Sequence, residues 1–121
     1  MNKILIKWFI KDDTNNKIGV LIAFTEYNQP DQIIIGFSLC NAKDTFNKHK
    51  GTEIAINRGE FHKDTCLYRV KVRGEDSKVS RKQFVIIPQT VFEQIFAFIT
   101  NVKEKYPNGQ MSPWVDQILY G

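Results

Sequence analysis

The sequence predicts an α+β fold in which an antiparallel-rich, five-stranded sheet carries its helices on one face. Five segments rich in β-branched and aromatic residues are bounded by turn-forming residues: 3–10, 18–25, 33–41, 66–73 and 82–87. A strongly amphipathic pattern over 91–102 predicts a long helix. With a shorter helix over 48–58 and a last one from Ser112-Pro113, the expected order is β-β-β-α-β-β-α-α, which is typical of α+β domains.

The first three strands are predicted from their composition and from the turns between them. The sequence DDTNNK joins the first two as a hairpin, and YNQPDQ leads into the third. Apolar residues run continuously through 33–35 instead of alternating, which favours a central strand buried on both faces. Gly36 inside this strand indicates a bulge or close packing against a helix.

The helix boundaries follow from capping residues. Asn47 is a suitable N-cap for the helix over 48–58, and Gly59 is placed to end it in the left-handed conformation. The segments 66–73 and 82–87 are expected to form a second hairpin. The run Thr90-Val91-Phe92-Glu93 has the capping-box pattern, so the long helix is expected to begin there.

Length and composition predict a single domain over 1–121. A chain of 121 residues is long enough for one core, and nine Phe with 42% apolar residues favour a folded chain. Lys7 interrupts the opening apolar stretch, and no apolar run approaches the roughly 20 residues that a membrane helix needs. Two cysteines are too few for a disulfide scaffold. We therefore expect a soluble, cytoplasmic protein with no membrane partner.

Positive charge is concentrated in the middle of the chain. Residues 43–82 carry eleven Lys/Arg against six Asp/Glu, whereas the rest of the chain has a net charge of −1. Such asymmetry favours an anionic partner, although a solvated lysine-rich surface would give the same pattern.

The best candidate site lies where the third strand leads into the first helix. A helix N-terminus presents unpaired N–H groups and partial positive charge, and cations there are unfavourable unless an anion binds. The predicted ligand-binding residues are Asn41, Lys43, Asp44, Phe46, Lys48, Lys50, Gly51 and Arg58. The alternative is a surface loop anchored by a buried Phe46, with Arg58 serving only its own helix C-terminus.

A second basic surface is expected on the fourth strand and the loop after it. Its residues are Arg69, Lys71, Arg73 and Arg81. A basic strand suits a phosphate backbone, but charges on an edge strand also prevent aggregation.

Metal binding and catalysis have weaker support. Cys40, His49, His62 and Cys66 have the spacing C-x8-H-x12-H-x3-C, which lacks the close cysteine pairs of zinc modules. No paired carboxylates or oriented nucleophile are evident. We expect a protein that is not an enzyme and uses no metal and no cofactor.

The segment SLCNAKDTFNKHKGTEIAINR resembles small accessory proteins encoded by tailed phages and prophages. The residues that carry the resemblance are Cys40, Asn41, Lys43, Asp44, Phe46, Lys48, Gly51, Ile54, Ala55 and Arg58. It implies a bacteriophage protein acting in the infected bacterial cytosol in a host–virus interaction. Such proteins include counter-defence sponges of the Thoeris anti-defence type, which bind nucleotide immune signals without cleaving them.

The leading functional hypothesis is thus a nucleotide-binding anti-defence sponge that sequesters a signal of the cyclic nucleotide or cyclic ADP-ribose type and acts as a homo-oligomer. One alternative is a phage protein that binds nucleic acid through residues 69–82. Another is an inhibitor that binds a host enzyme through exposed aromatic residues such as Trp8, Phe98 or Trp114.

Overall fold

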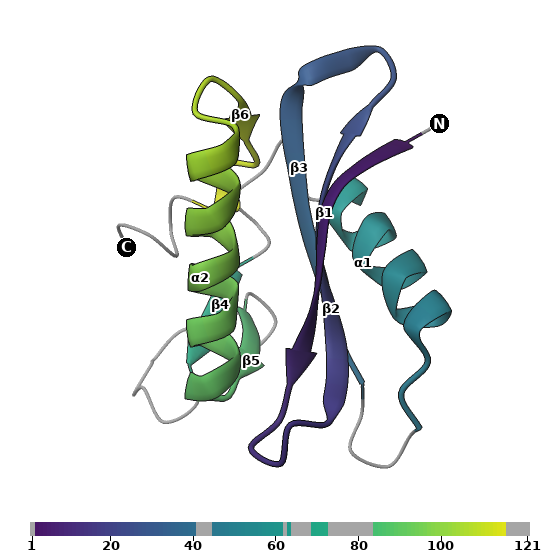
Figure 1. Cartoon of the computed structure of the whole chain (residues 1–121), viewed down its shortest axis with the longest axis vertical. Coiled ribbons are helices and arrows are strands. Elements are labelled where there is room, and N and C mark those ends of the chain that lie inside the picture. Colours follow the sequence, from purple (N-terminus) through teal and green to yellow (C-terminus); the bar gives the residue numbers. More distant parts are fainter. Residues whose placement is uncertain (1, 41–44, 62, 64–68, 73–83, 116–121) are drawn as a thin grey trace.

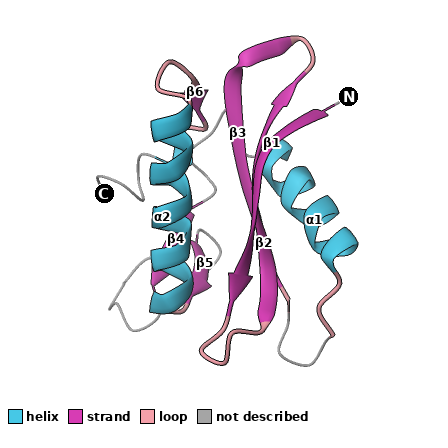
Figure 2. Ribbon diagram, viewed as in Figure 1, coloured by secondary structure: helices cyan, strands magenta, loops and turns pink. Residues whose placement is uncertain are grey.

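The computed structural model describes residues 2–40, 45–61, 63, 69–72 and 84–115, with the side chains of 69–72 and 84–87 left out. Figure 2 shows these residues as strands and helices with short connections. The elements are β1 (Asn2–Lys11), β2 (Lys17–Glu26), β3 (Gln29–Leu39), α1 (Lys48–Phe61), β4 (Arg69–Val72), β5 (Phe84–Ile87), α2 (Gln89–Lys105) and β6 (Gln110–Met111). The α+β class is confirmed.

The main sheet has four strands in the order β1-β2-β3-β6, so the expected five-stranded sheet is wrong. Strands β1, β2 and β3 are antiparallel neighbours, as predicted, while β6 pairs parallel with β3 through Gln32 and Ile33. The short strands β4 and β5 pair with each other instead of extending this sheet. They run parallel, so the prediction that they form a second hairpin is wrong. Two strands of a hairpin are antiparallel, whereas parallel strands need a crossover connection.

The two helices cover opposite faces of the main sheet, which corrects the expectation that both lie on one face (Figure 1). The reason lies in β2 and β3, whose consecutive apolar residues point alternately to the two sides. Leu21 and Ile35 belong to the core under α2, whereas Ile22 and Ile34 belong to the core with Ala55 of α1. Both faces therefore need a cover, and the prediction that the third strand is buried on both faces is confirmed.

Helix α1 crosses strand β3 at Gly36, where the two backbones lie close together. A Cβ at Gly36 would lie 2.0 Å from the Ala55 carbonyl oxygen, so the close packing against a helix that Gly36 indicated is confirmed. Gly59 does not end the helix as expected, because α1 continues to Phe61. Instead Gly59 is buried, and a Cβ there would lie 3.3 Å from the Gly36 Cα. Both glycines let backbone approach backbone.

Helix α2 begins earlier than the capping box predicted. Its N-cap is Pro88, with extended backbone and no side-chain cap, and Gln89 is its first residue. Five apolar residues of α2 are buried: Val91, Ile95, Phe98, Ile99 and Val102. Most of the last predicted helix lies outside the described residues; of its start, residues 112–115 are described, and Trp114 and Val115 are buried.

Candidate ligand-binding site

The N-terminus of α1 is capped by a side chain, as the sequence predicted. Asn47 Oδ1 accepts a hydrogen bond from the Lys50 N–H at 3.0 Å, and the Asn47 carbonyl accepts one from Gly51 N–H at 2.8 Å. Lys48, His49 and Lys50 follow, all exposed, and the first turn has no acidic residue. Cations at this end oppose the helix dipole, so an anion would relieve the repulsion.

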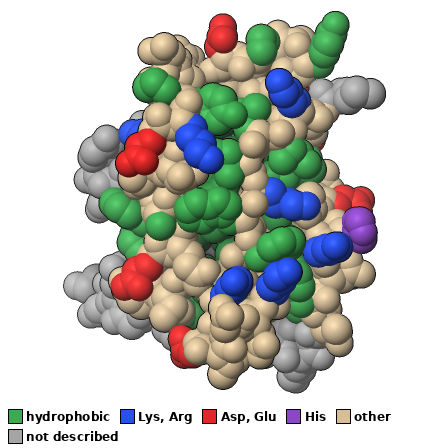
Figure 3. All heavy atoms as spheres, viewed as in Figure 1, with side chains coloured by type: hydrophobic (Ala, Val, Ile, Leu, Met, Phe, Trp, Pro, Cys, Tyr) green, Lys and Arg blue, Asp and Glu red, His purple; other side chains and the backbone are tan. Residues whose placement is uncertain are grey.

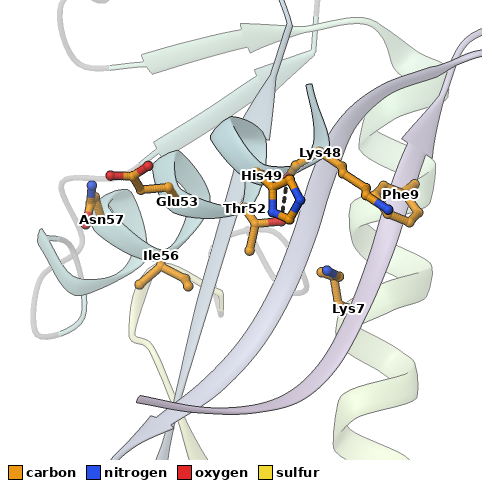
Figure 4. A pocket seen from close by; sticks show the side chains of 8 residues that line it. All are labelled: Lys7, Phe9, Lys48, His49, Thr52, Glu53, Ile56 and Asn57. Atoms are coloured by element: carbon orange, nitrogen blue, oxygen red, sulfur yellow. Dashed lines mark hydrogen bonds between the residues drawn. The ribbon is translucent and has the colours of Figure 1, made fainter. Parts of the chain in front are cut away.

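A cleft lies between α1, from its first turn to Asn57, and strand β1, with a volume of about 580 Å³. Its lining residues are Lys7, Phe9, Lys48, His49, Thr52, Glu53, Ile56 and Asn57. Figure 3 shows basic side chains running along this face of the molecule, with the acidic ones toward its outline. In Figure 4, Lys7, Phe9 and Lys48 gather on the β1 side of the cleft, while Glu53 and Asn57 lie farther along α1.

Phe9 forms an aromatic floor under lysine ammonium groups. Lys17 Nζ lies 4.4 Å from the ring centroid and Lys7 Nζ lies 5.8 Å from it, both within cation–π range. The edge-on ring of Phe46, with centroids 6.1 Å apart and an interplanar angle of 89°, supports Phe9 from the core side. The cleft therefore combines positive charge with a fixed apolar surface.

Those predicted site residues that the structure describes do not all line one cavity. Asn41, Lys43 and Asp44 lie outside the described residues. Lys48 lines the cleft beside β1, whereas a second cavity of about 530 Å³ is lined by Phe46, Lys50 and Gly51 together with the end of β3. Arg58 is exposed in the last turn of α1 and lines neither cavity.

The close packing of α1 on the sheet explains the glycine at position 51 without a ligand. A Cβ there would lie 3.1 Å from Val20 Cγ2, and Ser38 Oγ donates a hydrogen bond of 2.8 Å to the Gly51 carbonyl. The first turn of α1 thus packs directly on the sheet. Phe46 is half-buried against the same core, which favours the anchoring role for its ring.

Sequence reasoning missed the contribution of β1 to the cleft and the lysine of β2 that lies over Phe9. Lys7 and Phe9 are two residues apart, so they point to the same face of a strand. The predicted hairpin also brought Lys17 near the end of β1, where Lys11 pairs with it. The spacing of Lys7 and Phe9 could be read from the sequence. It did not show that β1 and α1 line the same cleft, because the two elements lie far apart along the chain.

The second basic surface is not tested by the structure. Arg69 and Lys71 lie on β4, whose side chains are not described, and Arg73 and Arg81 lie outside the described residues. Of the suggested aromatic anchors for a host enzyme, Phe98 and Trp114 are fully buried, which corrects that expectation for both. Trp8 is 37% exposed.

Among the described residues, no three His, Cys, Asp or Glu side chains are grouped so that they could hold a metal ion. Cys40 is half-buried beside the second cavity and His49 is exposed at the cleft, whereas His62 and Cys66 lie outside the described residues. In the same part of the chain, no helix has the length and apolar character needed to cross a membrane.

Comparisons of the chain with protein-family models, with curated proteins and with solved structures gave no match. The resemblance to phage accessory proteins therefore stays a prediction.

Proposed function

We propose that this protein binds a small phosphate-bearing ligand of the nucleotide type in the cleft between β1 and α1, without transforming it. One observation carries the proposal: Lys7 and Lys48, from elements far apart in the sequence, line one cleft together with Phe9 and His49. A volume of about 580 Å³ lies within the usual range for small-molecule sites.

The positive groups suit the phosphate. Lysine ammonium groups form charge-assisted hydrogen bonds with phosphate oxygens, and the dipole of α1 adds partial positive charge at the same end. No carboxylate in the first turn of α1 opposes an anion there. The phosphate is therefore placed between Lys7 and Lys48, beside the start of α1.

The remaining lining suits the rest of a nucleotide. The Phe9 ring offers an apolar surface on which a base stacks if it displaces the ammonium of Lys17, whose side chain is exposed and long. Glu53 and Asn57 on the outer turns of α1 supply acceptors for ribose hydroxyl or base amino groups. Each part of the cleft thus has a matching part of the ligand.

The biological setting of the proposal comes from the resemblance at residues 38–58. In that setting the protein is a phage-encoded anti-defence sponge that sequesters a nucleotide immune signal in the host cytosol, as an oligomer. Binding without cleavage is sufficient for this role, because stoichiometric capture lowers the free concentration of the signal.

The test begins with the ligand. The protein is purified from bacteria with active nucleotide signalling and denatured, and released small molecules are identified by mass spectrometry. In parallel, calorimetry measures binding of mononucleotides, cyclic dinucleotides and cyclic ADP-ribose. We expect one nucleotide to bind stoichiometrically and to be released from the purified protein. Failure to detect a nucleotide by either method would refute the proposal.

Charge-reversal variants then locate the site. Lys48→Glu and Lys7→Glu should each weaken binding at least about tenfold, because each replaces an attraction to phosphate by a repulsion. Lys105→Glu, on an exposed lysine at the end of α2, is the matched control and should bind normally. Normal binding by both cleft variants would place the site elsewhere. Affinity that grows with oligonucleotide length and falls steeply with salt would instead indicate a nucleic-acid-binding protein.

A further inference from the structure

Strand β1 forms one edge of the main sheet, and it spans ten residues from Asn2 to Lys11. An edge strand presents backbone N–H and C=O groups on its outer side, ready to pair with another strand. The view of Figures 1 and 3 looks toward this edge, between the two helices.

At the Lys11 end of β1, the side-chain amide of Gln94 occupies the place that a neighbouring strand would take. The Lys11 N–H donates to Gln94 Oε1 at 2.9 Å, and Gln94 Nε2 donates to the Lys11 carbonyl at 2.8 Å. The register of β1 with β2 shifts between Ile10 and Lys11 but is regular from Ile6 to Ile10, where every second residue, among them Lys7 and Phe9, turns its backbone groups outward. In the part of the chain that the structure describes, no side chain pairs with the backbone of these two residues as Gln94 does with Lys11.

The side chains along the edge define the chemistry of a partner. Every charged residue of β1 is a lysine, namely Lys3, Lys7 and Lys11, and all three are exposed. Two large apolar side chains lie between them, with Ile4 46% exposed and Trp8 37% exposed. Trp8 is held edge-on against Phe98, with ring centroids 5.3 Å apart, so its exposed part is a fixed surface.

We propose that β1 docks an extended, acidic segment of a partner protein as an added strand along Ile6 to Phe9, where its register with β2 is regular. The free backbone groups give such a segment its register, the lysines attract its carboxylates, and Ile4 and Trp8 contact its apolar residues on the two faces. A second copy of this chain fits less well, because antiparallel pairing of β1 with itself brings its lysines near one another. The inference does not depend on nucleotide binding.

The test uses a labelled ten-residue peptide in which Glu alternates with Val. Binding is followed by fluorescence anisotropy, and backbone amide exchange of the protein is followed by NMR. We expect saturable binding together with slower exchange of the Lys7 and Phe9 amides. The same peptide with N-methyl groups on the residues that face β1 should bind at least about tenfold more weakly, because it lacks the ladder donors. Equal affinity for the N-methylated peptide, or unchanged exchange at Phe9, would overturn the proposal.

Further controls test whether the lysines of β1 attract the acidic peptide and whether β1 pairs with a second copy of itself. Lys3→Glu should weaken the peptide several-fold without affecting nucleotides, because Lys3 does not line the β1–α1 cleft. A peptide with Lys in place of Glu should not bind. If the protein instead self-associates in sedimentation and the peptide fails to compete, a second copy occupies the edge and the proposal is wrong.

Discussion

Replacing Gly36 by alanine tests whether the close crossing of α1 over β3 stabilises the fold. The new Cβ would lie 2.0 Å from the Ala55 carbonyl oxygen and 3.0 Å from the Ala55 carbonyl carbon. Both atoms belong to the backbone of α1, so no side-chain rotation can relieve the clash. The helix itself must move away from the sheet.

The size of the effect follows from that distance. Ordinary contact begins near 3.4 Å, so α1 must shift by about 1.4 Å over Gly36. A gap of about 0.5–1 Å already loses a quarter to a half of a dispersion contact, and buried Ala55 and Ile34 lie beside the shifted segment. We expect a loss of about 2–3 kcal/mol in the free energy of unfolding, after a gain of about 0.5–1 kcal/mol from replacing a strand glycine.

The assay is urea unfolding, with thermal melting as a second measure. For a chain of this size, 1 kcal/mol corresponds to roughly 3–5 °C in Tm. The matched control is Gly51→Ala, where the new Cβ would meet the side chains of Val20, Ser38 and Phe46 at 3.1–3.4 Å and not the backbone of another element. Its packing cost is offset by a helix-propensity gain of about 1 kcal/mol, so it should remain within about 1 kcal/mol of wild type. A Gly36→Ala protein as stable as this control would refute the reasoning.

Three further substitutions test the hydrogen bonds that hold the same framework. Ser38→Ala removes the bond to the Gly51 carbonyl and should cost about 1 kcal/mol in urea unfolding, whereas a neutral effect would show that water replaces it. Gln94→Ala should speed hydrogen exchange at the Lys11 amide, measured by NMR, and an unchanged rate would contradict the pairing. Hydrogen bonds, chiefly from the Asn16 backbone and the Thr14 side chain, lower the pKa of Asp12 below its ordinary 3.8. Asp12→Ala should therefore destabilise most above that value, and its deficit should shrink as the pH falls through the lowered pKa; a deficit independent of pH would contradict this.

Local features were predictable because they depend on neighbouring residues. Asn47 caps α1 through its own side chain, and the continuously apolar run 33–35 lies in a strand buried on both faces. The capping box at 90–93 predicted the wrong start for α2, and the reason is also local. Pro88, with its fixed φ, is the N-cap, two residues before the predicted one.

The candidate site was only half predictable. The basic start of α1 followed from the lysines around Asn47, since a helix N-terminus is a local property. Its partner residues Lys7 and Phe9 lie some forty positions earlier, and only the packing of α1 on β2 and β3, with β1 paired to β2, brings them to Lys48. The same packing separates Lys48 from Lys50, because successive residues of a helix point in different directions.

The sequence by itself determined the α+β class, the three antiparallel strands, the two main helices and the cationic start of α1, because each is encoded in local composition and periodicity. Tertiary structure alone decided that the helices cover opposite faces, that β4 and β5 pair apart from the main sheet, and that β1 is both an open edge and a wall of the cleft. These features depend on which apolar faces meet, and contacts between residues far apart in the chain leave no periodic signal in the sequence.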